Sequence, residues 1–481
     1  MLVKIKVDDI EIKVNKNKNL IYELKKHSIN IPHFCYHPQM GVEGNCRMCL
    51  IELKGAKRPQ IACDTPIKEN MEIFTKSASV KKLREAILEL EFINHPLDCS
   101  VCDQVGECSL QEYYMDYDLQ PSRMKVAKVD KEKHLNYGNG IIHDQERCVL
   151  CTRCVRFTKT ISKTDELGVI KRGDTSAIAV FPNIKTKNRY SQNIVDVCPV
   201  GAMTSEDFRF KRRVYFLKTA NSICHGCSKG CNIYIDHEKK KYAKNDLIYR
   251  FRPRVNENIN NHFMCDDGRY SYKLENKNTL EFAFIKNKKV SDIKAINQAK
   301  EYLKNAIFLI SPNCNLEEMS AIKSLAKEVN AKLSGFSESY IRVGDGDDYL
   351  IQDDKSANRN GLKILEISQD FNELKKYLNS CENIFIFNSK AMLACEELLN
   401  LTKDKNIINI NSKENELVEI SNINIPCSSF SQKSGTIINC DNIVQKYERA
   451  IISQRMDLVD IISEFLGKEV DLDIDLLMKE K

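Results

Sequence analysis

The fourteen residues from His95 to Cys108 constrain this chain more than any other feature. They include one histidine and three cysteines, separated by gaps of three, two and five residues: His95, Cys99, Cys102 and Cys108. Such short gaps let four side chains surround one small metal centre. Imidazole and thiolate ligands suit zinc or iron–sulfur chemistry, and the flanking sequence has to decide between them. His95 alone would be an ordinary core or surface histidine, but its place before the cysteines makes it a candidate fourth ligand.

Cysteine is concentrated in the first part of the chain. Fifteen of the twenty cysteines lie between Cys35 and Cys265, many of them two or three residues apart. The alternating N-terminus, Met1–Val7, lacks the apolar core of a signal peptide, and no run approaches the ~18 apolar residues of a membrane span. We therefore expect a soluble, cytosolic chain. A disulfide framework is not expected there, and the clustering points to metal.

Charge is nearly balanced, with 73 basic and 67 acidic residues and a net charge of +6. The basic runs Lys211–Arg213 and Lys239–Lys241 suit a solvated face or an acidic partner surface better than nucleic acid. A nucleic-acid binder would interleave aromatic with basic residues beside the cysteines, and this chain does not.

Residues 1–78 predict a small α/β unit. Leu2–Val7 and Ile10–Val14 are expected to pair as a hairpin, with a short helix over Leu20–His27. Four cysteines follow with gaps of ten, two and thirteen residues: Cys35, Cys46, Cys49 and Cys63. Gly41 and Gly44, in the first gap, let the backbone approach inorganic sulfur and aim N–H groups at it. The spacing resembles a plant-type [2Fe–2S] ferredoxin with a longer first gap. The alternative, a zinc loop, more often uses two short Cys pairs.

Residues 79–140 predict helix, with Leu83, Ile87 and Leu90 as a packing stripe that leads to His95. The next cysteines follow the bacterial [4Fe–4S] pattern, closed by Cys198 after a gap of 43 residues: Cys148, Cys151, Cys154 and Cys198. In two-cluster ferredoxins another cysteine stands where this chain has Thr158, so one [4Fe–4S] cluster is expected here, with zinc as the alternative.

A further set of three close cysteines needs a fourth, and Cys265 is the only nearby candidate: Cys224, Cys227, Cys231 and Cys265. The lysine-rich stretch between Cys231 and Cys265 is expected to be a surface hairpin. A fourth cluster follows from this set.

From residue 272 onward the sequence alternates between strand and helix. Ala306–Ile310, Ile384–Phe387 and Ile407–Ile410 are expected strands, with one helix capped by Asn315 and Glu318 and another near Met392–Leu399. Met319, Ile322, Leu325 and Val329 should form the apolar face of the capped helix. The scattered cysteines should be core residues: Cys314, Cys381, Cys395, Cys427 and Cys440. The region has six glycines and no G-x-G-x-x-G, and the aspartates of Gly344–Asp348 would repel a phosphate.

The order of these sites resembles one family, the large iron–sulfur subunit (the G subunit) of NADH-quinone oxidoreductase, respiratory complex I. The motifs Cys198-Pro-Val-Gly-Ala202 and Cys265-Asp-Asp-Gly-Arg-Tyr270 support the resemblance over residues 1–271. Beyond it, only Ser434–Asn439 and Gln445 are similar to a segment of the family's molybdopterin-enzyme-like domain. The last domain is far shorter than the family's.

The resemblance implies a multidomain α+β and α/β fold in five parts. These are a β-grasp [2Fe–2S] ferredoxin-like domain (1–78), a helical His/Cys3 [4Fe–4S] segment (79–140), a [4Fe–4S] ferredoxin-like domain (141–215), an additional four-Cys [4Fe–4S] subdomain (216–271) and a shortened molybdoenzyme-like α/β domain without cofactor (272–481).

It also implies one [2Fe–2S] and three [4Fe–4S] clusters on the four ligand sets, and no molybdopterin. The Cys224–Cys265 cluster occurs in only some members of the family, off the main electron path. The implied partners are other peripheral-arm subunits, namely the donor module and the quinone-module iron–sulfur subunits. The chain would meet the membrane only through that complex, on its cytoplasmic face. It would relay electrons in an NADH-quinone oxidoreductase with no complete active site, and no catalytic residue, of its own.

A formate dehydrogenase or hydrogenase-type oxidoreductase is the alternative. Those enzymes usually carry a paired two-cluster ferredoxin where Thr158 breaks the pattern. A molybdopterin enzyme also needs a far larger domain than residues 272–481, and no cysteine group after Cys265 could hold a hydrogenase cluster.

Overall fold

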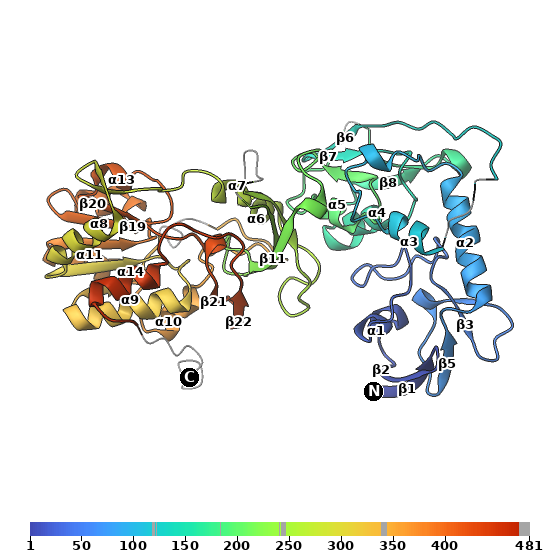
Figure 1. The fold of residues 1–481 in the computed structure, drawn as a ribbon, viewed down its shortest axis with the longest axis horizontal. Helices are drawn as coiled ribbons and strands as arrows, with labels where there is room; N and C mark the ends of the chain where they lie inside the picture. Colours follow the sequence, from blue (N-terminus) through green and yellow to red (C-terminus); the bar gives the residue numbers. More distant parts are fainter. Residues whose placement is uncertain are drawn as a thin grey trace. The chain divides into compact units, whose positions relative to one another are not determined.

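The structure is a computed structural model that describes residues 1–117, 121, 123–182, 184–239, 241, 247–337 and 344–470. The chain forms two compact units, Met1–Phe216 and Leu217–Lys481. Both contain helices and strands (Figure 1), which confirms the predicted mixture of α and β structure.

A five-stranded mixed sheet begins the N-terminal unit, in the order β2-β1-β5-β3-β4. Its elements are β1 (Leu2–Val7), β2 (Ile10–Asn15), α1 (Leu20–Lys26), β3 (Leu50–Leu53), β4 (Gln60–Ile61) and β5 (Met71–Phe74). The predicted hairpin of β1 and β2 and the predicted helix are confirmed. Alternation buries Val3, Ile5 and Val7 against Leu20 and Leu24 of α1, and this core supports the loop from residue 31 to residue 49.

Helix α2 (Ala78–Phe92) follows, and its buried face differs from the predicted stripe. Leu90 is 67% exposed, whereas Val80, Arg84 and Leu88 are buried, so the expected packing role of Leu90 was wrong. The cause is Arg84, which lies in the buried stripe because it donates hydrogen bonds to the carbonyls of Thr75 and Leu50. A charged residue at that position conceals the true apolar face from pattern analysis.

The predicted helix over 79–140 is only partly confirmed. After α2 the chain is helical again in α3 (Ser109–Tyr117), with a 3-10 turn at Cys99–Val101. Residues 123–134 form neither helix nor strand, and β6 begins at Leu135. The segment between α2 and α3 carries the candidate metal ligands, and a loop that turns four ligands toward one centre cannot be a continuous helix.

The remainder of the unit surrounds the third cysteine motif. Its elements are β6 (Leu135–Gly138), β7 (Ile141–His143), α4 (Arg153–Arg156), β8 (Leu167–Ile170), β9 (Ala177–Val180), α5 (Asn193–Val197) and β10 (Met203–Ser205). Strand β7 ends five residues before Cys148, and β10 begins five residues after Cys198. Because β7 and β10 pair antiparallel, they bring the two ends of the motif together.

The C-terminal unit begins with a three-stranded sheet, β11 (Lys218–Ile223), β12 (Asn232–His237) and β13 (Ile248–Pro253), followed by α6 (Asp266–Tyr270) and α7 (Tyr272–Glu275). The antiparallel pair β12–β13 confirms the hairpin predicted between Cys231 and Cys265. Part of its turn, residues 240 and 242–246, lies outside the described residues.

A seven-stranded sheet forms the rest of the unit, in the order β15-β14-β20-β19-β18-β16-β17 (Figure 1). Its strands are β14 (Ala283–Ile285), β15 (Lys288–Val290), β16 (Ala306–Ile310), β17 (Lys332–Ser334), β18 (Asn383–Phe387), β19 (Asn406–Asn411) and β20 (Ile423–Pro426). Five neighbouring strands are parallel, as the strand–helix alternation predicts: β20, β19, β18, β16 and β17. A small antiparallel ribbon, β21 (Gly435–Ile438) with β22 (Val444–Tyr447), follows the sheet.

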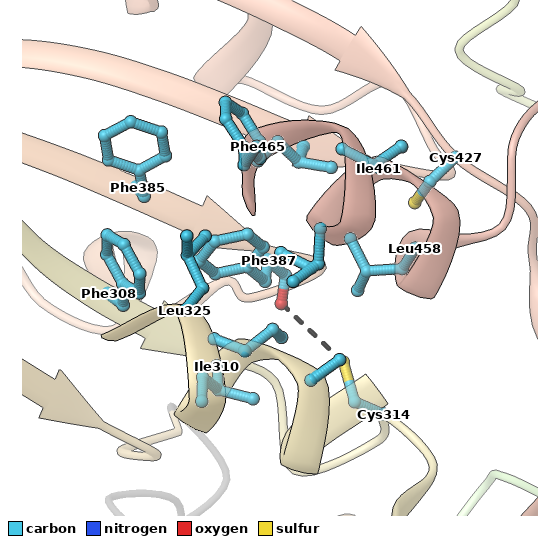
Figure 2. Close-up of a cluster of buried hydrophobic side chains, with 14 of the residues drawn as sticks. Phe308, Ile310, Cys314, Leu325, Phe385, Phe387, Cys427, Leu458, Ile461 and Phe465 are labelled. Carbon is cyan, nitrogen blue, oxygen red and sulfur yellow. Dashed lines mark hydrogen bonds between the residues drawn. The ribbon is translucent and has the colours of Figure 1, made fainter. Parts of the chain in front are cut away.

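Helices cover both faces of this sheet. They are α8 (Asp292–Ala299), α9 (Leu316–Val329), α10 (Arg359–Ile364), α11 (Phe371–Ser380), α12 (Glu396–Asn400), α13 (Leu417–Ile420) and α14 (Leu458–Leu466). On one face, Leu325 of α9 and Phe465 of α14 pack on Phe308 and Phe385 (Figure 2). The capping box of Asn315 and Glu318 is present as predicted.

The predicted apolar face of α9 is confirmed, because Met319, Ile322 and Leu325 are buried and Val329 packs against the same core. The core prediction for the C-terminal cysteines is confirmed for Cys314, Cys381 and Cys427. Cys395 is partly buried and packs against the core on the other face of the sheet, whereas the prediction is wrong for Cys440, which is partly exposed and belongs to no core cluster of the described residues. Cys440 lies in the turn that follows β21, where a thiol reaches the surface.

Candidate metal centres

The first set of cysteines lines a loop of the N-terminal sheet. Cys35, Cys46, Cys49 and Cys63 are all buried. A hydrogen bond from the Cys46 thiol lowers the pKa of Cys35 to about 5, and the N–H groups of Cys46, Asn45 and Gly44 act in the same direction. Gly44 has a φ of +69°, which glycine adopts without strain. The loop therefore aims backbone donors at sulfur, as its glycines predict.

Those four thiols form one group. The Cys63 thiol hydrogen-bonds Cys49 and lowers its pKa, and Cys35 also lies within electrostatic range of Cys49. The Phe34 N–H donates to Cys46 Sγ over 3.4 Å. Donors that point at sulfur stabilise its negative charge, which is the state that binds iron.

The second set lies between α2 and α3. Burial first, and the nearby Cys102 and Cys99 to a smaller extent, raise the pKa of Cys108 to about 11. Arg213 donates hydrogen bonds to the carbonyls of Cys102 and Ser100, and so fixes the turn that carries two of these thiols. The structure thus brings the three cysteines of this set together.

His95 lies on the same segment, at the end of α2. Its ring packs edge-on against Phe92, with 6.1 Å between ring centroids. Burial lowers the pKa of His95 to about 4, so the imidazole is neutral near pH 7, the form that binds metal. Within the described residues, no hydrogen bond joins the imidazole to the three thiols, and the charged groups that act on it are Asp98, Arg147 and Lys128. Asp98, the other possible ligand, is engaged by Arg147, whose Nη2 lies 2.6 Å from Oδ2.

The third set surrounds one cavity. Four thiols and the apolar side chains of Val149, Ile178, Val200, Ala202 and Met203 line it, the thiols being those of Cys148, Cys151, Cys154 and Cys198. Burial first, and the neighbouring thiols second, raise the pKa of Cys148 and Cys154. Thiols that hinder one another's ionisation need a cation to become thiolates, so metal binding here would release protons.

Thr158 occupies the place of the missing ferredoxin cysteine. It is fully buried in the π-helical turn Phe157–Ile161, and its hydroxyl donates to the Val155 carbonyl over 2.9 Å. The side chain is therefore an ordinary packed helix residue.

The fourth set lies in the C-terminal unit. Burial and then Cys265 and Cys227 raise the pKa of Cys224, and the same thiols act on Cys231. Gly268 lets the two ends of the set approach, because a Cβ there would lie 2.9 Å from Cys224 Sγ and 3.3 Å from Cys265 Sγ. The Gly268 N–H also donates to Cys265 Sγ over 3.3 Å.

Three of the four sets share one apolar core in the N-terminal unit. This cluster includes Phe34, Met48, Leu88, Leu110 and Val200 together with cysteines of the first, second and third sets, namely Cys35, Cys46, Cys108, Cys148, Cys151 and Cys198. The Cys108 thiol is also close enough to raise the pKa of Cys198. Sites that were separate in the sequence are therefore neighbours in the fold.

Two arginines connect the first and third sets, and sequence analysis missed them. Arg153 and Arg156, on either side of Cys154, reach the loop that carries Cys35. Arg153 Nη2 donates to the Tyr36 carbonyl over 2.7 Å. Arg156 donates to the carbonyls of Met40, Gly41 and Cys35. Their only sequence signal is a basic residue on each side of a ligand, which a solvated face would explain equally well.

Replacing Arg156 by Met should loosen the first site. The change removes charged donors from three loop carbonyls, and such hydrogen bonds contribute about 1.5–3 kcal/mol each when made by an ion. We expect the visible absorption of a cluster bound by the first cysteine set to be lost at a lower denaturant concentration. The shift should be equivalent to about 2–4 kcal/mol, less than the sum of three such bonds, because water can bond to the carbonyls that lose the arginine. The exposed Arg172 provides a control, since Arg172→Met should leave the midpoint unchanged. Equal midpoints for the two variants would show that the hydrogen bonds of Arg156 do not stabilise the first site.

The spacing of the candidate ligands can be compared with that of a single-ion site. In the parts of the chain that the structure describes, no three His, Cys, Asp or Glu side chains converge closely enough to hold one ion. Zinc–sulfur bonds of about 2.3 Å would place tetrahedral sulfurs only about 3.8 Å apart.

No helix in the described residues combines the length and apolar character needed to cross a membrane.

Comparison with known proteins gives matches in the same segments. A 2Fe-2S iron-sulfur cluster binding domain matches residues 1–78. The NADH-ubiquinone oxidoreductase-G iron-sulfur binding region matches residues 84–123. The ferredoxin-like domain of NADH-quinone oxidoreductase subunit 3 matches residues 138–204.

Curated relatives carry related names. The NADH-ubiquinone oxidoreductase 75 kDa subunit of Reclinomonas americana is 35% identical over 347 residues, 71% of this chain and 49% of that protein. The G subunit of NADH-quinone oxidoreductase from Rickettsia conorii is 38% identical over 272 residues, 56% of this chain and 39% of that protein. The 75 kDa subunit of Dictyostelium discoideum is 31% identical over 454 residues, 90% of this chain and 62% of that protein.

The chain spans about half the length of the curated relatives that it matches. The matched regions contain the first three ligand sets, in the order that the sequence motifs predict. On these matches, the segments of this chain that carry the first three ligand sets are similar to those of the G subunits of NADH-quinone oxidoreductases and the 75 kDa subunits of NADH-ubiquinone oxidoreductases.

Proposed function

We propose that this chain is the iron–sulfur electron-transfer subunit of a respiratory NADH-quinone oxidoreductase and carries electrons from a donor module toward quinone. The observation that carries the proposal is the shared core of the N-terminal unit, in which cysteines of three ligand sets pack together. Curated relatives bear the name of that enzyme. The chain acts as part of an oxidoreductase and holds no complete active site of its own.

The proposed cofactors are one [2Fe–2S] and three [4Fe–4S] clusters, which would each accept and pass on one electron at a time. The proposed ligands are Cys35, Cys46, Cys49 and Cys63; His95, Cys99, Cys102 and Cys108; Cys148, Cys151, Cys154 and Cys198; and Cys224, Cys227, Cys231 and Cys265. The chain's own residues hold these ligands in place, exclude water and direct N–H groups at sulfur. Those are the means by which a protein sets cluster potentials.

The domain boundaries of the proposal are 1–78, 79–140, 141–215, 216–271 and 272–481. The last domain is proposed to be a shortened molybdoenzyme-like domain that binds no molybdopterin or nucleotide. Two features support this. The carboxylate of Asp353 accepts the Gly346 N–H over 2.7 Å, and that of Asp347 accepts the N–H groups of Tyr349, Leu350 and Ile351, so the acidic loop binds its own donors.

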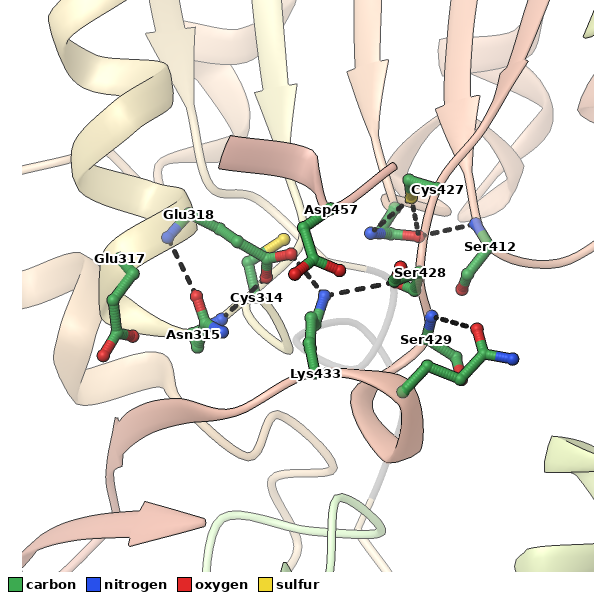
Figure 3. A network of polar contacts seen from close by, with 12 residues as sticks. Cys314, Asn315, Glu317, Glu318, Ser412, Cys427, Ser428, Ser429, Lys433 and Asp457 are labelled. Carbon is green, nitrogen blue, oxygen red and sulfur yellow. Dashed lines mark hydrogen bonds and ion pairs between the residues drawn. The ribbon is translucent and has the colours of Figure 1, made fainter. Parts of the chain in front are cut away.

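The second feature is a buried ion pair beyond the carboxyl ends of the parallel strands, where α/β sheets usually bind ligands. Lys433 Nζ bonds to the Glu318 carboxylate and, over 3.3 Å, to the Ser428 carbonyl (Figure 3). The two side chains are almost completely buried and neutralise each other. A cofactor phosphate would have to compete with that carboxylate for the lysine.

The proposed partners are the donor-module and quinone-module subunits of the same complex, with no nucleic acid. The chain would be peripheral, on the cytoplasmic face of the membrane that holds the complex. Exposed basic residues such as Lys239 are available for acidic partner surfaces.

A Cys151→Ser variant in the native complex tests the function. Loss of the third cluster should lower NADH-driven quinone reduction by more than about tenfold, equivalent to about 1.4 kcal/mol of barrier. Reduction of ferricyanide by NADH, which can draw electrons from the donor module, should persist. Full quinone reduction without the cluster's EPR signal would contradict the proposal. A native complex that oxidises formate or hydrogen rather than NADH would favour the alternative class of oxidoreductase.

A further inference from the structure

We propose that the C-terminal domain clamps the fourth cluster site, with Asn439 and Gln445 as positioning residues for the cysteine loop. The loop is Ser228-Lys229-Gly230, between Cys227 and Cys231. This inference rests on the proposed fourth cluster, and it gives the shortened domain a task that the family resemblance does not supply. The parts involved all lie within the C-terminal unit.

The backbone of the cysteine loop is held from both sides by distant segments. The Ser228 N–H donates to the Asp354 carbonyl over 2.8 Å, and the Ser228 carbonyl accepts the Cys440 N–H over 2.8 Å. The next carbonyl, that of Lys229, accepts Asn439 Nδ2 over 3.1 Å. These partners lie more than one hundred residues from the loop in the sequence, so the subdomain 216–271 does not supply them.

Side chains reinforce the same contact. Lys229 Nζ lies 2.9 Å from Asp441 Oδ2. Gln445 Oε1 accepts a hydrogen bond from Nδ2 of Asn232, the residue after Cys231. Gly230 has a φ of +60°, and a Cβ there would lie 2.8 Å from Gln445 Nε2. Gln445 therefore packs directly on the loop, close to the third ligand of the set.

Burial shows why the loop depends on these contacts. Cys227, Ser228 and Cys231 are at most 8% exposed, while Asn439 is fully buried and Gln445 is 7% exposed. Buried polar groups that lose a partner cost about 1–3 kcal/mol each, so the loop cannot keep this shape without the clamp. Within the loop itself, the Gly230 N–H donates to the Cys227 carbonyl over a long 3.3 Å.

Cys440 offers a competing explanation, because its partly exposed thiol is near Cys227 and Ser228 and could be a fifth ligand. The clamp, however, uses the Cys440 backbone N–H, which Ser retains. Cys440→Ser should therefore keep the fourth cluster, whereas a ligand role predicts its loss.

The experiment compares four variants of the full chain after anaerobic reconstitution: Asn439→Ala/Gln445→Ala, Gly230→Ala, Cys440→Ser and Asn409→Ala. Asn409 is a matched control, a buried asparagine of the same domain that bonds Asn424 over 2.9 Å, away from the loop. The measurements are iron per chain, the EPR signal of each cluster and near-ultraviolet circular dichroism.

We expect the double variant and Gly230→Ala to fall from about 14 to about 10 iron atoms per chain, with the other three signals unchanged. The two control variants should keep about 14. Should the double variant not fold, Gly230→Ala decides, because it leaves the C-terminal domain intact. Retention of the fourth signal in Gly230→Ala and in a folded double variant overturns the clamp, and so does its loss in Cys440→Ser. A wild-type chain with about ten iron atoms overturns the fourth cluster itself, which separates the two failures.

Discussion

A Gly201→Ala variant is expected to lose the second cluster and to disturb the third. Gly201 follows the Cys198 ligand by three residues, and a methyl group there would overlap Cys102 Sγ of the second set. It would also lie 3.0 Å from Gln104 Cβ, on the same turn. Because both neighbours belong to a ligand loop, either the Cys102 thiol or the 198–203 segment must move. We expect iron to fall from about 14 to about 10 atoms per chain.

Gly168 provides the matched control for that change. It lies in β8 of the same unit, and a Cβ there would meet no atom within 4 Å. Gly168→Ala should keep all of the iron and every EPR signal. If Gly201→Ala also keeps them, the second and third sets are not in the contact that the structure shows.

Replacing His95 by Cys is expected to keep a [4Fe–4S] cluster but to lower its potential. A thiolate adds a negative charge that the neutral imidazole lacks, and the added charge disfavours the reduced state. Histidine ligands raise the potential of Rieske centres, so a shift on the order of 100 mV is reasonable for one ligand. His95→Ala should instead make that cluster labile while the other three persist, because their ligands come from other segments.

Potentiometric EPR of both His95 variants measures the potential of each cluster and so tests whether His95 is a ligand. The structure makes the imidazole neutral and engages Asp98 with Arg147, which leaves the histidine available as the fourth ligand. Among the described residues no hydrogen bond joins the ring to the thiols, so this role remains a prediction. Unchanged potentials for every centre in His95→Cys would show that His95 is a bystander and that Asp98 or water completes the site.

The sequence predicts local features of this chain well. Cysteines two or three residues apart must lie on one short loop. The alternation of β1 and the capping box at Asn315 likewise depend only on neighbours in the chain. Each of these was predicted from a window of a few residues. The glycine-rich first gap likewise predicted backbone donors on Cys35.

Contacts between distant segments could not be predicted in this way. Arg156 reaches a loop more than one hundred residues earlier, and Gly201 matters only because Cys102 lies against it. The buried face of α2 was mistaken because Arg84 occupies it and finds carbonyl partners on other elements. Such positions depend on tertiary packing, which no local pattern records.

The most direct test of the central claim is the iron and acid-labile sulfide content of the full chain after anaerobic reconstitution, read together with EPR of the reduced protein. One [2Fe–2S] and three [4Fe–4S] clusters predict about 14 iron and about 14 sulfide per chain, with four separable signals. A colourless preparation that contains mainly zinc and little sulfide would contradict the account.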